Sequence, residues 1–436
     1  MLKVLKFGGS SMADAHQLEK VRSIVEADPA RRVVVVSAAG KRFKDDHKIT
    51  DLLYLCHAHL QYGVSCDGIF DMVRSRYLEI RDELGLTTPL EAEFDALRAK
   101  MDKGISADEL VSRGEYFAAR LMADYLGYDF LDSTCWLRFR LDGTVDQPAS
   151  YEALRRTASG RRVVIPGFYG AMPDGTVHTF SRGGSDVTGS VVARAVGAGL
   201  YENWTDVSGV LSADPRIIEH PHVVDYITYR ELRELSYMGA SVLHEEAIFP
   251  VRSEGIPINI RNTNAPEDKG TLIVEDTCRK PRFTITGIAG KKDFASITIE
   301  KAMMNSEVGF CRKVLEVFEN NNISIEHMPS GIDTMTIFVH RDEFEEKEQD
   351  VIAGIHRAVE PDFLELESDL ALIAVVGRGM RATRGTSGRI FAALAHANVN
   401  VKMIDQGSSE LNIIIGVRSH DFDAAINAIY DIFVKT

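Results

Sequence analysis

The spacing of apolar and polar residues divides the chain into two regions of different character. Over residues 1–265, short apolar runs alternate with longer stretches in which apolar residues recur at helical spacing. Strands are predicted at residues 2–7, 32–37, 162–166, 176–180, 199–205 and 257–261, and helices at 14–27 and over most of 50–130. Strands that alternate with helices are typical of a parallel sheet covered on both faces. We therefore expect an α/β domain of three layers, αβα, with a largely parallel central sheet.

The C-terminal region carries a different pattern, which repeats once. A constant offset aligns Gly309 with Gly385 and Asn322 with Asn398. Each copy predicts a strand, a glycine-bearing loop, a helix and two further strands, the order of a ferredoxin-like βαββ module. The expected parts are a domain at 1–265, a polar linker at 266–283, and two modules at 284–360 and 361–436. Modules this small present sheet edges, which favours pairing with the other copy or with a second chain.

Composition narrows the functional classes. The formal net charge of −14 argues against a nucleic-acid surface, which needs a basic face. No apolar stretch approaches about 20 residues and no signal-peptide pattern opens the chain, so no membrane span and no export are expected. Five cysteines without a Cys-x-x-Cys pair indicate reduced thiols and a cytoplasmic protein. No metal site built from protein side chains is predicted, because His244-Glu245-Glu246 lacks the second histidine of H-E-x-x-H.

The stretch VLKFGGSS at residues 4–11 is the first candidate for chemistry. Lys6 stands on a predicted strand, and Gly8, Gly9 and Ser10 follow at the turn into a helix. Glycines at such a turn let phosphate oxygens approach backbone N–H groups without a Cβ in the way. A helix N-terminus and a lysine both favour an anion there. A plain tight turn beside a lysine would leave the same pattern.

A second glycine-rich helix start follows the predicted strand at 176–180. Arg182 precedes Gly183 and Gly184, and Ser185 and Asp186 open the helix. Arginine suits bidentate capture of a carboxylate, whereas Asp186 suits an ammonium group or caps the helix. Two such corners, one with lysine and one with arginine, indicate a site for anions more strongly than either does alone.

Two further positions carry polar groups where a ligand could lie. Glu115 lies on the apolar flank of a predicted helix, so its carboxylate needs a cation, either a substrate ammonium or a nearby arginine. Thr205 and Asp206 end a predicted strand, and open α/β sheets bind ligands at the carboxyl ends of strands. An ordinary turn would also account for these two residues.

One motif suggests another class of enzyme. Residues 377–382 fit G-x-G-x-x-A after a strand, and Asp405 ends a later strand where a ribose-binding acid would lie. About 60 residues follow the motif, too few for two nucleotide-binding halves. The internal repeat accounts for the segment better than a dinucleotide site does.

Taken together, the motifs resemble those of the aspartate kinases, amino-acid-kinase enzymes with tandem C-terminal ACT modules. They are KFGGSS at 6–11, VVVVSA at 33–38, ITDLL at 49–53, RGE at 113–115, GFYG at 167–170, SRGGSD at 181–186, WTDVSGVLSADPR at 204–216, GASVLH at 239–244 and QGSSELNI at 406–413. They occur in the order of the family and cover nearly the whole chain. The sequence differs from many relatives at Ser241, where they carry lysine, and at Leu211, where tyrosine occurs.

The resemblance implies ATP-dependent phosphorylation of the β-carboxylate of L-aspartate to 4-phospho-L-aspartate, with Mg²⁺, as the first step toward lysine, threonine and methionine. The implied ATP-binding residues are Lys6, Gly8, Gly9, Ser10, Ser37, Thr205, Asp206, Asp214 and Arg216. The implied aspartate pocket comprises Thr50, Glu115, Phe168, Arg182, Gly183, Ser185 and Asp186, with Lys6, Arg182 and Asp186 as catalytic residues.

ACT modules in such enzymes imply binding of an end-product amino acid, here lysine or threonine, and assembly into a homodimer or a higher homo-oligomer. Candidate effector residues are Met304, Asn305, Ser306, Glu307, Gly309, Phe310, Ser330 and Asp333. The carboxylates of Glu307 and Asp333 favour a cationic effector. Two alternatives stay open: a kinase of the same family that acts on another carboxylate or on a nucleotide, and an ACT amino-acid sensor with little catalytic activity.

Overall fold

The chain folds into two compact units. A computed structural model describes every residue except 182, 241, 242, 244, 278–280 and 436. The first unit comprises Met1–Val210, Val223–Tyr229 and Val242–Thr277, and the second comprises Leu211–His222, Arg230–Ser241 and Cys278–Thr436. Among the described residues, none of the helices combines the length and the apolar character that crossing a bilayer requires.

The first unit is built on an eight-stranded sheet in the order β3-β4-β2-β1-β7-β9-β10-β8. Its strands are β1 (Lys3–Phe7), β2 (Arg31–Val36), β3 (Asp129–Phe130), β4 (Val163–Pro166), β7 (Leu200–Thr205), β8 (Tyr226–Thr228), β9 (Ile258–Asn262) and β10 (Thr271–Val274). The first six strands in this order, which end with β9, are parallel to one another, and β10 pairs antiparallel with β9. The central strands are buried on both faces, as expected for runs such as Val33–Val36.

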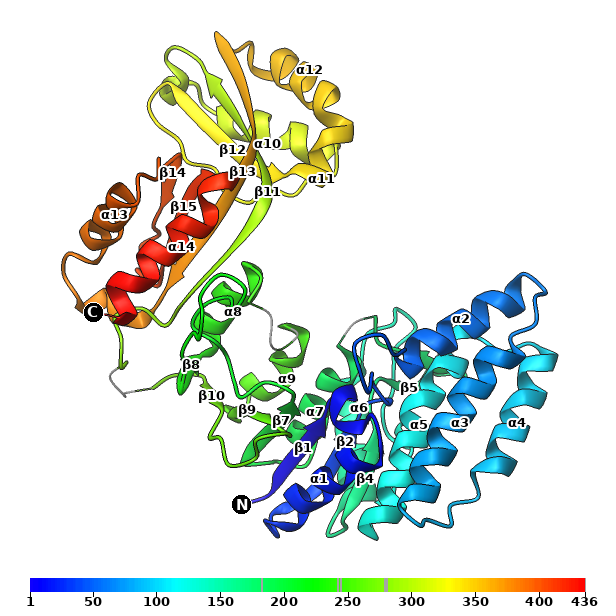
Figure 1. Ribbon diagram of the computed structural model, residues 1–436. Helices are drawn as coiled ribbons and strands as arrows, with labels where there is room; N and C mark the ends of the chain where they lie inside the picture. Colours follow the sequence, from blue (N-terminus) through cyan, green and yellow to red (C-terminus); the bar gives the residue numbers. More distant parts are fainter. Residues whose placement is uncertain (182, 241–242, 244, 278–280, 436) are drawn as a thin grey trace. The chain divides into compact units, whose positions relative to one another are not determined.

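Helices cover both faces of this sheet and complete the three layers. The helices are α1 (Ala15–Glu26), α2 (Ile49–Gln61), α3 (Asp67–Glu83), α4 (Leu90–Lys103), α5 (Ala107–Leu126), α6 (Gln147–Ala158), α7 (Gly184–Ala195) and the short α9 (Phe249–Arg252). Helices α1 to α5 share one apolar core with Leu5 and Phe7 of β1. Figure 1 shows α2 to α5 lying together at one side of the first unit. Because side chains alternate along a strand, Lys6 points to the other face, where α7 contacts β1.

The second unit is a five-stranded antiparallel sheet in the order β12-β11-β13-β15-β14. Its elements are β11 (Gly287–Glu300), α10 (Phe310–Asn320), β12 (Thr334–His340), α11 (Arg341–Phe344), α12 (Glu348–Val359), β13 (Phe363–Val376), α13 (Thr386–His396), β14 (Met403–Asp405), β15 (Asn412–Arg418) and α14 (Phe422–Tyr430). Helix α8 (Tyr229–Tyr237) bridges the last residue of a first-unit segment and a second-unit segment.

The predicted repeat is confirmed in the backbone of the second unit. The same offset relates β11 to β13 and α10 to α13. Gly309 and Gly385 each precede their helix in the left-handed conformation, with φ of 85° and 82°. Asn322 and Asn398 each follow their helix with φ of 51° and 57°. The two repeats, which are similar in sequence, therefore form the same turns before and after their helices.

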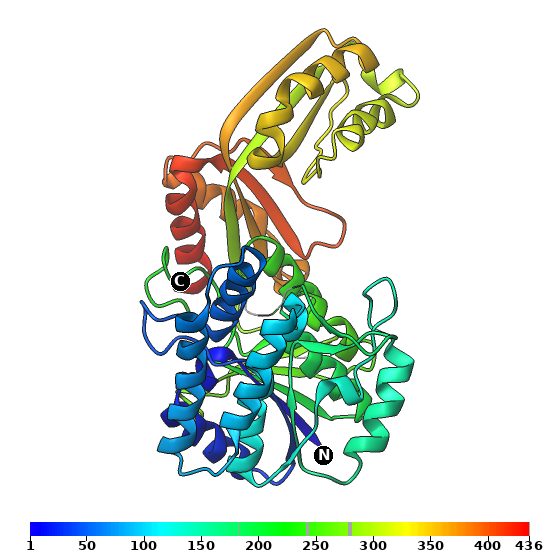
Figure 2. The ribbon, with the colours of Figure 1, turned by 90° about the vertical axis from the view of Figure 1, so that its right-hand side faces the viewer.

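The two long strands β11 and β13 run through both modules (Figures 1 and 2). The first half of β11 pairs with the second half of β13 and belongs to a core with Ile288, Ile373 and Ile415. The second half of β11 pairs with the first half of β13, in a core with Ile297 and Val314. Each module is completed by residues from the other copy.

Some elements differ from the sequence expectation. Strand β10 lies within the segment expected as a linker. It was not predicted because its two buried positions, Thr271 and Ile273, are flanked by polar turn residues that hide the alternation. The helix expected at 14–27 is confirmed as α1 (Ala15–Glu26), but a four-residue 3₁₀ turn, η1 (Gly9–Met12), which the pattern did not predict, separates it from the glycine pair. The strand expected after the first ACT helix is reduced to isolated bridges at His327 and Ser330.

Candidate active site

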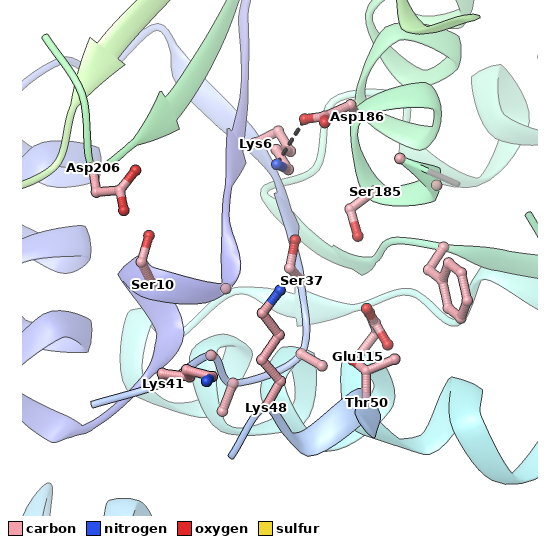
Figure 3. Close-up of a pocket in the computed structure, with 17 residues that line it drawn as sticks. Lys6, Ser10, Ser37, Lys41, Lys48, Thr50, Glu115, Ser185, Asp186 and Asp206 are labelled. Carbon is pink, nitrogen blue, oxygen red and sulfur yellow. Dashed lines mark ion pairs between the residues drawn. The ribbon is translucent and has the colours of Figure 1, made fainter. Parts of the chain in front are cut away.

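A cavity of about 600 Å³ opens in the first unit, at the carboxyl ends of β1 and β2 and the start of α7. It is lined by Lys6, Gly9, Ser10, Ser37, Ala38, Ala39, Gly40, Lys41, Lys48, Thr50, Glu115, Phe168, Gly183, Gly184, Ser185, Asp186 and Asp206. Figure 3 shows these side chains converging from separate parts of the chain. The position is the one at which open parallel sheets bind ligands, and the volume suits a small-molecule site.

Lys6 and Asp186 form an ion pair across the cavity wall. Lys6 Nζ lies 2.7 Å from Asp186 Oδ1, and Asn203 Nδ2 donates to the same oxygen at 2.8 Å (Figure 3). Lys6 is only 7% exposed, so its ammonium has a fixed position rather than a freely moving one. The pair brings together the lysine of the first corner and the acid of the second.

The first corner is formed by close backbone contacts. The N–H of Gly8 donates to the carbonyl of Trp204 at 3.0 Å, and the N–H of Gly40 donates to that of Gly9 at 2.8 Å. A Cβ on Gly40 would lie 2.5 Å from the backbone of Gly9, so only glycine fits this approach. Because η1 has only four residues, the anion-binding helix terminus expected here is replaced by the local amides of a tight turn.

The second corner retains the expected helix start. Gly183 precedes α7 in the left-handed region with φ of 56°, and Ser185 and Asp186 lie in the first turn of α7. Phe168 also has a positive φ, 79°, and its N–H donates to Thr188 Oγ1 at 3.0 Å. Such a backbone is strained for a bulky residue and is concentrated at functional sites. Arg182, the predicted carboxylate clamp, lies outside the described residues.

Glu115 is buried in the floor of the cavity with one oxygen unpartnered. The residue is 5% exposed, and its Oε2 has no hydrogen-bond partner. Burial raises the pKa of the Glu115 carboxyl to about 8, and the N–H of Ala38 and the charge of Lys6 offset this only partly. Within the described part of the chain, no arginine pairs with Glu115. The open acceptor therefore favours the substrate ammonium over the structural arginine.

The structure brings most of the predicted site residues together. Lining the cavity are Lys6, Gly9, Ser10, Ser37, Thr50, Glu115, Phe168, Gly183, Ser185, Asp186 and Asp206. Gly8 and Thr205 each neighbour a lining residue without lining the cavity themselves. Asp214 and Arg216 belong to the second unit, where they pair at 2.6 Å and line another cavity of about 900 Å³.

Two lysines of the cavity were missed by the sequence reasoning. Lys41 and Lys48 lie on the segment between β2 and α2, which runs along the cavity. Its position after a central parallel strand was the available signal, because such loops lie at the ligand-binding edge of the sheet. The polar, lysine-rich sequence of the segment instead resembled an ordinary exposed loop.

The candidate effector residues also lie close together. The 3₁₀ turn η4 (Met304–Ser306) meets the turn at 330–333, where Asn305 N donates to Ile332 O at 3.1 Å. Asp333 Oδ1 accepts from Met303 N at 2.9 Å. Glu307 pairs with Lys301 and Lys313 at 2.8 Å and 2.6 Å, and hydrogen bonds from these lysines lower its pKa. Both carboxylates thus have partners, and the charge argument for a cationic effector is not supported.

The glycines of the G-x-G-x-x-A motif have a structural role. A Cβ on Gly377 would lie 2.6 Å from Thr286 N, and one on Gly379 would lie 2.5 Å from Thr284 O. These glycines admit a neighbouring backbone segment of the second unit. They therefore give no support to a dinucleotide site.

Comparison with known proteins agrees with the motifs and the fold. Residues 1–262 match the Amino acid kinase family, and residues 373–433 match an ACT domain. The chain is 40% identical to Aspartokinase 3 of Bacillus subtilis, over 99% of this chain and 98% of that protein. It is 28% identical to the chloroplastic Aspartokinase 1 of Arabidopsis thaliana, over 99% of this chain and 80% of the relative.

Solved structures show the same likeness. The aspartate kinase of Clostridium acetobutylicum is 49% identical, with a TM-score of 0.91 over 99% of both chains. The aspartokinase III of E. coli, solved with aspartate and ADP, shares the fold with a TM-score of 0.76 over 99% of both chains, at 24% identity. The chain is 40% identical to a named aspartokinase over nearly its whole length, its first 262 residues match the family model, and its fold matches a solved aspartate kinase. The chain therefore belongs to the amino acid kinase family, among the aspartokinases.

Proposed function

We propose that this chain transfers the γ-phosphoryl group of ATP to the β-carboxylate of L-aspartate, giving ADP and 4-phospho-L-aspartate. The observation that carries the proposal is the convergence of Lys6, Gly9 and Ser10 with residues 183–186 on one cavity that also contains the open carboxylate of Glu115. The cavity thus offers a cation for the phosphates and a buried acceptor for an ammonium group. The named aspartokinases that match over the whole chain support the same substrate.

The reaction needs no general base. The β-carboxylate of aspartate has a pKa near 3.9 and is ionised at neutral pH. One of its oxygens forms a bond to the γ-phosphorus, and the bond from that phosphorus to the bridging oxygen of ATP breaks, leaving its electron pair on ADP. The difficulty is the repulsion between two anions, which positioned cations and amides reduce.

The cavity residues divide this task between them. Lys6 is paired with Asp186, which Asn203 in turn holds by a hydrogen bond, and it places a cation at the phosphates. Gly9 and Ser10 line the same cavity, and their backbone amides would donate to phosphate oxygens there. Glu115 receives the substrate ammonium at its unpartnered oxygen, which orients the β-carboxylate away from the cavity floor. Thr50, Ser185 and Phe168 complete the aspartate pocket, with Arg182 as the carboxylate clamp.

Mg²⁺ fits this site as a companion of the nucleotide. Among the described residues, no cluster of three histidine, cysteine or acidic side chains could hold a metal ion without other ligands. Mg²⁺ commonly binds through one or two carboxylates together with substrate phosphates. Asp206, which lines the cavity, would supply such a carboxylate. When bound, the ion would neutralise phosphate charge.

We also propose that the ACT modules adjust the kinase in response to lysine or threonine. The residues of η4 and of the 330–333 turn, with Gly309 and Phe310, form the candidate effector site. The outer strands β12 and β14 leave sheet edges available to a second copy, which supports a homodimer or a higher homo-oligomer. Differential affinity of the effector for two states would then shift activity.

Aspartate-dependent ADP release tests the proposal. We expect turnover with aspartate and none with glutamate or a nucleoside monophosphate, and inhibition by lysine or by threonine. Lys6→Ala should lower kcat by at least about 10³-fold, because a phosphate-facing cation is lost, while Lys103→Ala on an exposed helix position leaves it unchanged. Turnover with glutamate and not with aspartate would show that aspartate is not the substrate. A kcat of Lys6→Ala within threefold of wild type would show that Lys6 has no catalytic role.

A further inference from the structure

Two lysines of the cavity have no part in the mechanism described so far. Lys41 and Lys48 line it from the segment between β2 and α2, and Figure 3 shows both on the side of the cavity away from Lys6 and Asp186. Figure 3 shows the Lys48 side chain pointing into the cavity, toward the side that holds Lys6. The segment therefore adds two positive charges to a site that must receive two anions.

The charge balance of the cavity leaves room for a second cation. Lys6 is already paired with Asp186 at 2.7 Å, so the carboxylate of Asp186 partly neutralises the positive charge of Lys6. Among the cavity residues drawn in Figure 3, Lys6–Asp186 is the marked ion pair, and Lys48 is not joined to a carboxylate. Lys41 Nζ donates to the carbonyl of Lys44 at 3.5 Å, on its own loop. Lys48 is thus the cation that a bound phosphate would meet without displacing a protein partner.

The place of Lys48 in its helix makes a purely structural role a poor explanation. Lys48 is the N-cap residue of α2 and makes no side-chain capping hydrogen bond. A cation at a helix N-terminus is unfavourable, because it adds to the positive end of the helix dipole. The dipole and the ammonium together raise the positive potential of the cavity, which helps only when an anion is present.

The segment that carries Lys48 is fixed by a buried charge cluster. Asp46, 7% exposed, accepts from Arg76 Nη2 at 2.9 Å and 2.7 Å and from Arg42 Nε at 3.0 Å. Arg76 Nη1 also donates to Gly40 O at 3.1 Å. Burial raises the pKa of Asp46, but hydrogen bonds from Arg42 and the charge of Arg76 lower it well below its ordinary value. The loop is thereby anchored to α3 just before Lys48.

We propose that Lys48 is a second catalytic cation, which contacts the transferred phosphoryl group from the wall that faces Lys6, and that Asp46 is its positioning residue. This inference rests on the proposed function. As the carboxylate oxygen bonds to the γ-phosphorus and the bond to the bridging oxygen breaks, negative charge on the phosphoryl oxygens lies between the two ammonium groups. Lys48 exchanges no proton and forms no covalent bond.

The test compares Lys48→Gln with Lys44→Gln, an exposed lysine on the same loop that does not line the cavity. We expect Lys48→Gln to lower kcat about 100-fold with the KM for aspartate within threefold, and Lys48→Arg to recover about tenfold of the loss. Lys44→Gln should match wild type. The affinity for ADP, measured by isothermal titration calorimetry, should stay within threefold, because ADP lacks the transferred group.

Each outcome decides one point. A kcat of Lys48→Gln within threefold of wild type, or an equal loss in Lys44→Gln, would overturn the role of Lys48 and leave the proposed function intact. Absence of aspartate-dependent turnover in the wild-type protein would overturn both. Asp46→Asn should lower kcat in the wild-type background and change it less than threefold in Lys48→Gln, since it acts through that lysine. Equal losses in both backgrounds would show that Asp46 does not position Lys48.

Discussion

Two buried glutamates, one in each unit, differ in how their charge is satisfied. Glu231 in the second unit is fully buried and accepts hydrogen bonds from Thr286 Oγ1 at 2.6 Å, Arg378 N at 3.0 Å and Arg378 Nη1 at 2.8 Å. Glu115 in the first unit is nearly as buried, yet one of its oxygens has no partner. The hydrogen bonds of the Glu231 carboxylate are thus supplied by the protein, whereas those of the Glu115 carboxyl are not complete.

The difference indicates which buried carboxylates await a ligand. A buried charge without partners costs free energy, so a fold retains one only where something else compensates for it. In Glu231 the compensation comes from the same unit. In Glu115 it comes, in our proposal, from the substrate ammonium. Burial alone would have grouped the two residues together, and only the unpartnered oxygen separates them.

The largest expected effect is on catalysis. Glu115→Gln should lower kcat/KM for aspartate on the order of 10³-fold, about 4 kcal/mol, because a desolvated partner of the ammonium loses its charge. The KM for ATP should stay within threefold. Steady-state kinetics with each substrate varied in turn measures both. A kcat/KM for aspartate within tenfold of wild type would make Glu115 a structural residue like Glu231.

A smaller effect, on stability, is expected at the other glutamate. Glu231→Gln leaves the part-buried guanidinium of Arg378 without its buried counter-charge and should cost about 3 kcal/mol. Thermal unfolding should show the loss as a lower Tm, while kcat/KM for aspartate without effector stays within threefold. An unchanged Tm would mean that Arg378 finds another partner, and the contrast between the glutamates would weaken.

The smallest effect is a pH dependence of stability with an unusual sign. Folding raises the pKa of Glu115 from its ordinary 4.5 to about 8, so the folded state binds more protons than the unfolded state between these values. Stability is then lost as pH rises through this range. Glu115→Gln lacks this loss and should gain on the order of 2 kcal/mol over wild type at pH 8.5, with no gain at pH 4. Melting curves across pH that run parallel for the two proteins would contradict the raised pKa.

Much of the fold follows from the sequence pattern because its strands and helices are strongly periodic. The apolar run at 32–37 became the buried strand β2, and one of the long helices expected over 50–130 became α5, whose N-cap Ser106 accepts at Oγ from Glu109 N at 3.1 Å. Strand β10 escaped prediction because four residues between polar turns carry too little periodicity. Local signals identify long elements, whereas short ones depend on the sheet that accepts them.

The site was predictable where motifs carry it and not where a distant contact does. The glycine corners and Glu115 were found from local sequence and the family resemblance. Lys48 was not, because its position depends on the contact between Asp46 and Arg76, which are far apart in the sequence. Asp214 shows the converse: its motif continues directly from Asp206, yet the fold assigns it to the second unit.

The strands β11 and β13 have a consequence for anyone who would excise or transplant a single regulatory module. A cut after Glu360 removes from the first module the residues of β13 that complete its sheet. The same cut removes from the second module the start of β11, which completes the sheet there. Neither fragment would retain its full complement of strands. The two modules therefore form one structural unit, which can be grafted, deleted or exchanged only as a whole.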